Sequence, residues 1–324
     1  MKVRLGYVAI SNVLGKKVTS SSTVTFANYS KISSEEKRLE KLKTVALSNL
    51  SDLQEILKYN IKNNIHFYRI TSALIPLVTH PEVGYWGHRE IFNKDFQYVG
   101  KIIRQSNMRV DTHPDEFNVI NSSNPKVVEN TLINLMRQVE WFEDMNYEEG
   151  KMVIHVGGAT GGKEAALERF IKHFNDFPKE LKTRLIVEND DKTYTAKETL
   201  ELCKTLNIPM VLDVHHHNCN NNGEKLEDML EEILNTWDNE NLPPKMHFSS
   251  PRDNKDGKVD RKHADFINPY DFISFIEVAK RFNKDFDIML ECKEKDVALF
   301  KLTQDIKKIN LEYKWVDKST ILIE

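Results

Sequence analysis

The sequence has little cysteine and no long hydrophobic run. Its 324 residues include only three cysteines, Cys203, Cys219 and Cys292. Their odd number and wide spacing argue against a disulfide framework and fit a reducing cytoplasm. No stretch approaches ~18 uninterrupted apolar residues, which excludes a membrane-spanning helix. The apolar run near the N-terminus is also too short for a secretory signal.

Net charge and several common motifs are also missing. The formal net charge is only −3, which argues against binding nucleic acid by bulk charge, so a polyanion would need a local site. Walker-type and G-x-G-x-x-G sequences are absent, which excludes the usual nucleotide-triphosphate and dinucleotide sites. The chain has no Pro/Gly/Ser-rich linker, internal repeat or low-complexity tract. We therefore expect a single domain over residues 1–324.

What the chain does contain is a regular alternation of short apolar runs and amphipathic helical patterns. The predicted strands are Val3–Ile10, Ile65–Thr71, Met108–Asp111, Met152–Val156, Leu185–Val187, Met210–Val214, Met246–Phe248 and Ile288–Leu290. The predicted helices are Glu35–Asn63, Asn130–Asp144, Lys163–Asn175, Thr195–Leu206, Leu226–Trp237, Tyr270–Phe282 and Val297–Ile309. The predicted long loops are Pro76–Phe92, Asp115–Pro125 and Ser249–Asn268. Eight strands in this alternation predict an α/β (β/α)₈ TIM barrel, with a doubly wound open sheet as the alternative.

Residues that bind metals recur where the predicted strands end. From the third strand to the eighth, each strand ends in or near a histidine, aspartate or glutamate, and in a barrel these ends form one rim. A single such residue is more often a hydrogen-bonded rim histidine or a helix cap. Six strands in succession favour a metal site instead, because clustered carboxylates repel one another without cations.

The residue types indicate which metals would bind and how many. Imidazoles and carboxylates without thiolates suit Zn²⁺, Mn²⁺ or Fe²⁺. The number of candidate ligands exceeds the need of one ion and implies two or three. Sites of this kind hold both the attacking and the leaving oxygen of a phosphate ester. Three divalent ions would add a charge of +6 to the net charge of −3, and the resulting positive charge is compatible with a DNA substrate.

Several longer motifs resemble those of the UV damage endonucleases, from about residue 3 to about residue 300. The segments that carry the resemblance are 71–81 (TSALIPLVTHP), 113–117 (HPDEF), 155–158 (HVGG), 188–194 (ENDDKTY), 213–216 (DVHH) and 245–251 (KMHFSSP). The resemblance implies a TIM barrel with up to three divalent ions, for which Mn²⁺ is expected and Zn²⁺ or Mg²⁺ are alternatives. It also implies single-strand incision of damaged double-stranded DNA, immediately 5′ to a UV photoproduct or an abasic site.

The resemblance also implies roles for individual residues. The implied metal ligands are His113, His155, Glu188, Asp213, His216, His247, His263 and Glu291. Glu188 would bridge the ions as a catalytic residue, and His80 matches a family histidine near the cluster. Lys245 lies two residues before His247, so both side chains leave the strand on one face. We expect Lys245 to be neutral, paired with substrate phosphate or chemically modified, because an ammonium beside metal ions is unfavourable.

One ligand assignment depends on where a strand ends. Strict alternation from Asp213 would put His215 on the ligand face. The family pattern selects His216, which requires the strand to end at Asp213. We follow the family pattern and expect Cys219 and Cys292 not to coordinate.

Four residues are expected to contact the DNA. Glu116 and Phe117 follow His113 and resemble a family pair, Gln followed by Tyr or Phe, that probes the lesion. Tyr7 and Asn12 resemble the residues that face this pair. Glu116 departs from the family glutamine, and its carboxylate can only accept hydrogen bonds. The alternative is a capping glutamate beside a phenylalanine of the core.

Three other functions remain open at this stage. Metal-dependent sugar isomerases and epimerases use similar barrels and ligands, so fold alone cannot exclude that class. An abasic-site endonuclease without photoproduct activity and a non-enzymatic DNA-binding module are the others. We expect a monomer that acts on damaged DNA and has no membrane partner.

Overall fold

The computed structural model describes residues 1–255 and 258–324 and has a closed barrel of parallel strands at its centre. The eight barrel strands are β1 (Lys2–Val8), β2 (Phe67–Ile70), β3 (Arg109–Thr112), β4 (Lys151–His155), β5 (Leu185–Glu188), β6 (Met210–Asp213), β7 (Lys245–Phe248) and β10 (Phe286–Leu290). Each pairs with its neighbour in this order, and β10 pairs with β1 to close the ring. The TIM barrel prediction is therefore confirmed, and the open-sheet alternative is wrong.

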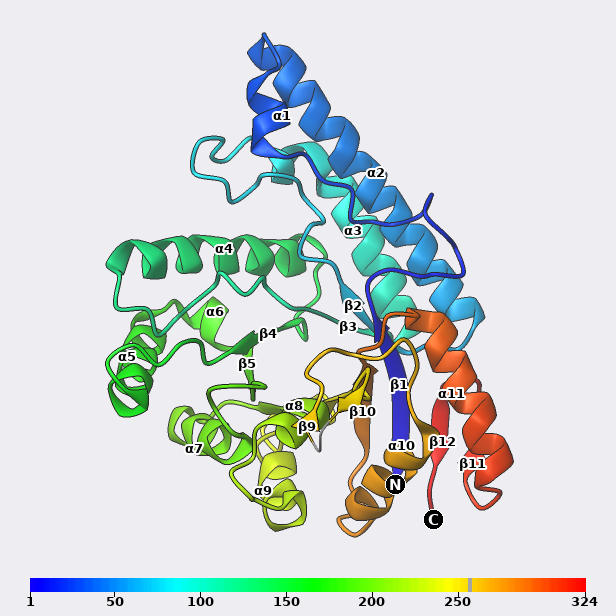
Figure 1. Ribbon diagram of the computed structural model, residues 1–324. Coiled ribbons are helices and arrows are strands. Elements are labelled where there is room, and N and C mark those ends of the chain that lie inside the picture. The colour runs from blue at the N-terminus through cyan, green and yellow to red at the C-terminus, as the bar shows by residue number, and fades with distance from the viewer. Residues whose placement is uncertain (256–257) are drawn as a thin grey trace.

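Helices surround the strands on all sides (Figure 1). The longer outer helices are α2 (Glu35–Lys62), α3 (His88–Ser106), α4 (Pro125–Asp144), α5 (Lys163–Asp176), α7 (Ala196–Leu206), α10 (Pro269–Lys280) and α11 (Lys295–Ile309). The shorter ones are α1 (Phe26–Ser30), α6 (Lys179–Lys182), α8 (Val214–Cys219), the 3₁₀ turn Leu226–Asp228 and α9 (Leu230–Asn235). The predicted helix Leu226–Trp237 is thus divided between the 3₁₀ turn and α9. The other predicted helices are confirmed to within a few residues.

Helix α3 is the element that the sequence analysis missed, because the loop prediction Pro76–Phe92 extended into it. Its first residues lack a capping side chain at Gly87, and Phe92 departs from helical geometry with φ −108° and ψ 16°. Gly100 lies inside the same helix, where a Cβ atom would come within 1.8 Å of the Met145 carbonyl oxygen. Tertiary packing therefore requires a residue that helix propensity disfavours.

The C-terminal tail forms a small sheet against the outside of the barrel. Strands β11 (Lys314–Trp315) and β12 (Thr320–Leu322) pair with each other, and β12 runs antiparallel to the first half of β1. Strand β2 pairs with β1 only at Tyr7 and Val8. The tail therefore covers the part of β1 that β2 leaves free.

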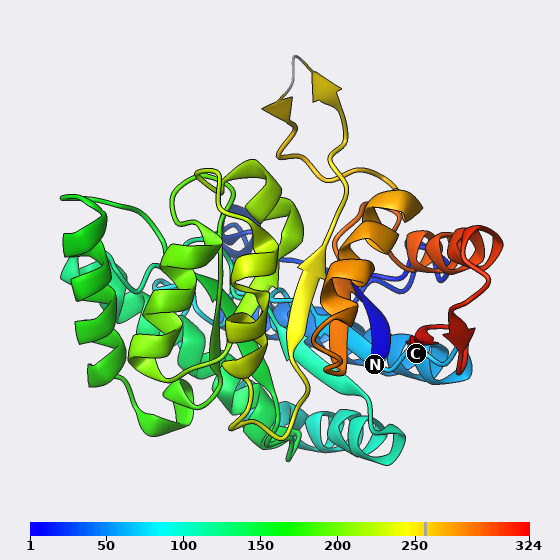
Figure 2. The same ribbon diagram turned by 90° about the horizontal axis from the view of Figure 1, so that it is seen from below.

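A two-stranded hairpin, β8 (Asn254–Lys255) and β9 (Lys258–Val259), follows β7. Seen from the side, it rises beyond the rest of the molecule at the end toward which β7 points (Figure 2). That end is where the barrel presents the carboxyl ends of its strands. No helix in the described part of the chain has the length and hydropathy to cross a membrane.

The barrel interior is more charged than an ordinary core. A small apolar cluster of Val153, Ile186, Val211 and Trp237 is separate from the main core. Nearby, the fully buried Asp287 pairs with both Arg4 (2.5 Å) and Arg109 (2.8 Å). Residues two apart in a strand point to the same side of the sheet. Inward-pointing positions further along the strands therefore place a second set of polar side chains at the carboxyl ends of the strands.

Candidate metal centre

Glu188 lies at the middle of the carboxyl-end rim and is surrounded by imidazoles. It ends β5 and is 1% exposed. Its Oε2 lies 3.1 Å from His113 Nε2 and 3.6 Å from His155 Nε2. Its Oε1 lies 2.7 Å from His247 Nδ1 and 3.5 Å from His216 Nδ1. One buried carboxylate therefore connects residues from four other parts of the rim.

The turn after β6 places Asp213 and His216 beside Glu188. Strand β6 ends at Asp213, whose Oδ1 caps α8 by accepting a hydrogen bond from the His216 amide at 2.8 Å. Its Oδ2 lies 3.7 Å from His216 Nδ1 and is buried without a hydrogen bond. The structure thus has the strand end that the choice of His216 required. Asp213 is a helix cap and keeps a second oxygen free for another partner.

Glu291 and His247 complete the cluster together with a residue that the sequence analysis did not select. Glu291 Oε1 lies 3.2 Å from His247 Nδ1 and 2.6 Å from Arg69 Nη2. Arg69 Nη2 also donates a hydrogen bond to His247 Nε2 at 2.7 Å. Arg69 is the third of four residues in β2. A charged residue inside a buried apolar strand was the available signal, because such residues are rarely buried without a partner.

Seven of the eight predicted ligands fall into three overlapping groups. The groups are His113–His155–Glu188, Glu188–Asp213–His216 and Glu188–His247–Glu291, and in each the candidate ligand atoms lie within 4.8 Å of one another. Glu188 belongs to all three. This sharing is the arrangement expected of a carboxylate that bridges several ions.

Neighbouring carbonyl groups orient two of the histidines for metal binding. His113 Nδ1 lies 3.1 Å from the Pro114 carbonyl, and His216 Nδ1 lies 2.9 Å from the Asn189 carbonyl. A carbonyl can only accept, so Nδ1 donates to it in both rings. At His113 this leaves Nε2, which lies 3.1 Å from Glu188 Oε2, available for an ion, whereas at His216 the nitrogen that faces Glu188 and Asp213 is Nδ1 itself. Metal-ligating histidines are oriented as His113 is.

The pKa values reflect the crowding of charge. Burial favours the neutral form of Glu188, but His247 and His155 outweigh it and hold its pKa well below the usual value. Burial raises the pKa of Asp213. Burial also opposes the charge on His216, yet Asp213 and Glu188 raise its pKa to about 9. The charges of the carboxylates and the histidines at this cluster therefore act on one another, as the shared position of Glu188 requires.

Lys245 lies below this cluster, inside the barrel. Its side chain is fully buried and its Nζ pairs with Asp111 Oδ2 at 2.5 Å. Burial lowers the pKa of Lys245 to about 8, although Asp111 opposes the shift. The structure gives this amine a buried carboxylate as its counter-charge, and a neutral amine and a contact with substrate phosphate both stay predictions. Chemical modification of the amine stays a prediction that an intact-mass measurement tests.

His263, the eighth predicted ligand, lies beside the cluster but in none of the three groups that the described residues form. Its ring centroid is 5.2 Å from that of His215 and 6.2 Å from that of His216. His215 is buried and faces the Arg261 carbonyl at 3.2 Å, away from Glu188. Cys219 Sγ approaches His215 Nε2 only to 4.0 Å. A ligand role for His263 stays a prediction.

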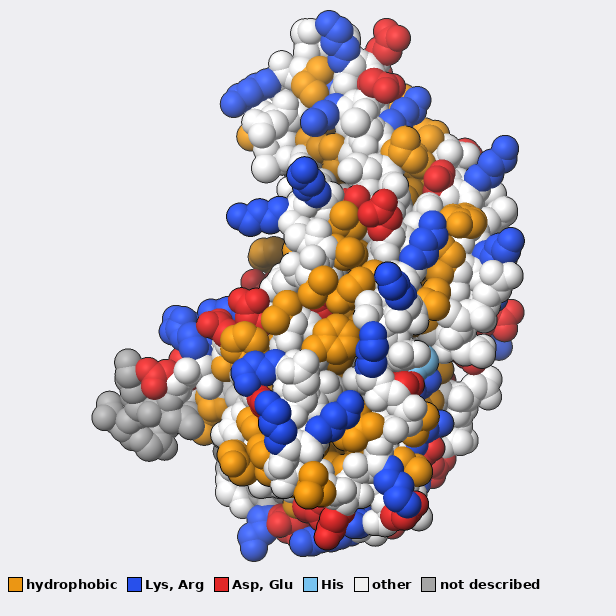
Figure 3. All heavy atoms as spheres, turned by 90° about the vertical axis from the view of Figure 1, so that its right-hand side faces the viewer, with side chains coloured by type: hydrophobic (Ala, Val, Ile, Leu, Met, Phe, Trp, Pro, Cys, Tyr) orange, Lys and Arg blue, Asp and Glu red, His pale blue; other side chains and the backbone are white. Residues whose placement is uncertain are grey.

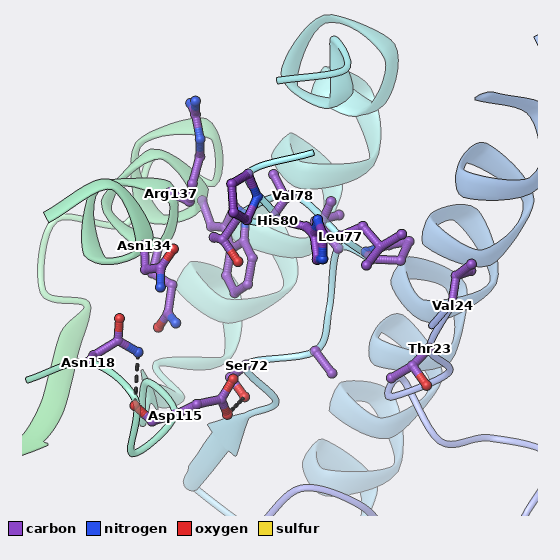
Figure 4. Close-up of a pocket in the computed structure, with 17 residues that line it drawn as sticks. Thr23, Val24, Ser72, Leu77, Val78, His80, Asp115, Asn118, Asn134 and Arg137 are labelled. Carbon is purple, nitrogen blue, oxygen red and sulfur yellow. Dashed lines mark hydrogen bonds between the residues drawn. The ribbon is translucent and has the colours of Figure 1, made fainter. Parts of the chain in front are cut away.

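His80 belongs to none of the three ligand groups in the described residues, and a role near the metal centre stays a prediction. Its ring stacks on Phe26 with a centroid distance of 4.2 Å. It lines a pocket of about 370 Å³ between the loop after β2 and helix α4 (Figure 4). Ser72 and Asp115, joined by a 2.7 Å hydrogen bond, line the same pocket. None of the residues in the three ligand groups lines it.

Tyr7 is the clearest correction among the expected DNA contacts. It is fully buried on β1, its hydroxyl donates to Asn60 Oδ1 at 2.8 Å, and its ring meets Tyr68 edge to face. Strand alternation points it away from the barrel interior and toward the helices. Asn12 is exposed, and its side chain donates to Glu294 Oε2 at 3.2 Å.

Glu116 and Phe117 lie on the surface in the loop after β3. Phe117 is 78% exposed, which excludes the core alternative for this residue. The loop is fastened on either side of it, because Asp115 accepts hydrogen bonds from Ser72 and Asn118. An aromatic ring held out from a fixed loop can stack on a nucleobase.

Basic side chains on one face and in the loop after β7 lie among side chains of other kinds. On the face of Figure 3, Lys and Arg side chains are scattered among hydrophobic and acidic ones. In the loop after β7, Arg252 and Arg261 each lie 3.7 Å from an aspartate oxygen. The side chains of Lys255 and Lys258 in the same loop lie outside the described part of the chain.

Comparisons with known proteins agree with this geometry. The family described as UV-endonuclease UvdE matches residues 3–320. The UV DNA damage endonuclease of Bacillus cereus (strain B4264) is 38% identical over 310 residues, which cover 95% of this chain and 96% of that protein. The crystal structure of SacUVDE is similar with a TM-score of 0.81 and 32% identity, covering 95% of this chain and 99% of that chain. Endonuclease IV from Thermus thermophilus, at 13% identity and a TM-score of 0.55 over 94% of this chain and 99% of that chain, shares the fold.

Proposed function

Since this chain belongs to the UV-endonuclease UvdE family, we propose that it is a metal-dependent DNA repair endonuclease. It would nick one strand of damaged double-stranded DNA immediately 5′ to a UV photoproduct, and also act at abasic sites. The observation that carries the proposal is the set of three ligand groups around Glu188 at the carboxyl-end rim. A sugar-binding enzyme of this fold needs fewer metal ligands than these groups provide.

The residues fit divalent ions in number and in chemistry. Asp213 Oδ2 and His155 Nδ1 are buried without hydrogen bonds, so two polar atoms of the cluster lack a partner that a bound ion would supply. Imidazole and carboxylate donors suit Mn²⁺, with Zn²⁺ or Mg²⁺ as alternatives. The proposed ligands are the seven residues of the three groups, which could hold up to three ions, and His263 as an eighth.

The chain's own residues would supply position and charge. Bound ions would provide Lewis-acid charge and a water of lowered pKa for phosphodiester hydrolysis. Glu188 would keep the ions a fixed distance apart, and His113 and His216 would hold their rings through the Pro114 and Asn189 carbonyls. Phe117 would stack on bases unpaired at the lesion, and Asn12 and Glu116 would lie beside the opening.

A plasmid nicking assay tests the proposal. Supercoiled plasmid, either UV-irradiated, depurinated or untreated, is incubated with the enzyme and Mn²⁺, and the cut ends are mapped. We expect 3′-hydroxyl ends immediately 5′ to the lesion, with untreated plasmid intact. Nicking of abasic plasmid alone would support an abasic-site endonuclease, and no nicking with any divalent ion would overturn the proposal. Sedimentation with and without DNA tests the expected monomer.

A further inference from the structure

Arg69 differs from every other cation near the cluster because it contacts two candidate ligands directly. Its guanidinium lies 2.6 Å from Glu291 Oε1 and 2.7 Å from His247 Nε2. Its side chain is 11% exposed. Within the described residues, the ion pairs of the other two ligand groups join only histidines and carboxylates. The group Glu188–His247–Glu291 therefore already holds a positive charge of its own.

The contact with His247 brings the guanidinium close to both nitrogens of that ring. Arg69 Nη2 lies 2.7 Å from His247 Nε2 and 3.5 Å from His247 Nδ1. His247 Nδ1 also lies 2.7 Å from Glu188 Oε1. A positive charge therefore lies next to both atoms through which this ring could bind an ion.

His113 and His216 have different neighbours. The Nδ1 of each ring lies beside a backbone carbonyl oxygen. An ion bound by His247 would require Arg69 to move away from the ring.

We propose that Arg69 is a built-in counter-cation that occupies the Glu188–His247–Glu291 group until a divalent ion displaces it. The inference rests on the proposed metal centre and ranks its three ligand groups by their affinity for a divalent ion. In the ion-free enzyme Arg69 holds Glu291 and His247 together and offsets their carboxylate neighbours. The ion at this group therefore binds last and most weakly, since it competes with a tethered positive charge, and the other two groups fill first.

Titration of ion-free enzyme with Mn²⁺, followed by calorimetry and by the electron paramagnetic resonance of free Mn²⁺, tests the ranking. We expect two ions to bind before a third, which binds at least about tenfold more weakly. Arg69→Gln should increase the affinity for the third ion by roughly tenfold and leave the affinities for the first two ions unchanged. Arg69→Lys keeps the charge and should resemble the native enzyme, as should Arg4→Gln, which removes an arginine from the other end of the barrel.

Three results would overturn the inference. They are three ions of equal affinity in the native enzyme, a weaker third ion in Arg69→Gln, or an equal strengthening in Arg69→Lys. The absence of any ion binding would instead refute the metal centre on which the inference rests. If Arg69→Gln does not fold, titration of the native enzyme and of Arg69→Lys still decides. Three ions of equal affinity in both proteins would contradict the role of Arg69.

Discussion

Phe117→Ala should separate lesion recognition from the rest of the enzyme. Phe117 is 78% exposed, and its loop is held by Asp115, which accepts from Ser72 and Asn118. Truncating an exposed side chain away from such contacts changes the free energy of unfolding by about 0.5 kcal/mol or less. Phe117 is not one of the proposed metal ligands, so the number of ions bound by the variant should be unchanged.

The expected loss is in binding damaged DNA. Stacking of one base on an aromatic side chain contributes about 1–3 kcal/mol. Since about 1.4 kcal/mol corresponds to a factor of ten, the ratio of damaged to undamaged binding should fall roughly five- to hundredfold. Phe117→Tyr retains the ring and should keep the ratio.

Competition binding measures this ratio with two duplexes of the same sequence, one of which contains a single photoproduct. Tyr98→Ala is the matched control, because Tyr98 is an exposed aromatic (43%) on the outer helix α3. The control should bind both duplexes as the native enzyme does. An unchanged ratio in Phe117→Ala, with native melting temperature and ion content, would refute the stacking role.

Four further predictions follow from the cluster and its surroundings. Glu188→Gln should keep the fold but lose nearly all incision, because one charge near each ion contributes on the order of several kcal/mol; native turnover with full ion content would contradict the bridging role. Glu116→Gln should preserve or tighten binding of damaged duplex in the competition assay, since it removes a carboxylate that repels phosphate, and weaker binding would contradict this. Lys245→Met should lower the free energy of unfolding by about 3–5 kcal/mol by leaving Asp111 unpaired, and adding Asp111→Leu should recover part of the loss in denaturant titration. Burial lowers the pKa of His88 to about 4, so the folded ring stays neutral while the unfolded ring gains a proton below about pH 6.5. The free energy of unfolding should therefore fall by up to about 3 kcal/mol between pH 6.5 and pH 4. His88→Phe should remove most of this dependence of the free energy of unfolding on pH.

The strands and most helices were predictable because their burial leaves a plain pattern. Strands such as Leu185–Glu188 are apolar on both faces, as parallel strands covered by helices must be. Helix α7 begins with Thr195 and Glu198, whose reciprocal hydrogen bonds form a capping box. Helix α3 was missed because its start lacks such a cap and its Gly100 is needed for close packing against Met145.

The candidate ligands were predictable for a different reason. They lie at strand ends, and the barrel brings all such ends to one rim. Tyr7 was assigned wrongly because the resemblance gave its position in the chain but not the face of β1 on which it lies. The stacking of His80 on Phe26, beside the pocket near α4, was not predictable from the sequence either. Side-chain direction in loops depends on contacts that are distant in the sequence.

Arg69 is one of several buried cations that lie beside carboxylates inside the barrel. Three carboxylates gathered in a barrel need positive charge whether or not ions are bound, because burial alone would raise their pKa values. The structure supplies that charge in successive layers: Arg69 lies on Glu291, Lys245 on Asp111, and Arg4 and Arg109 on Asp287. Each cation comes from a strand position that an apolar core would fill with valine or isoleucine. Charged residues at inward strand positions therefore indicate a charged site above them, and a search for buried cations would have found Arg69 beside its ligands.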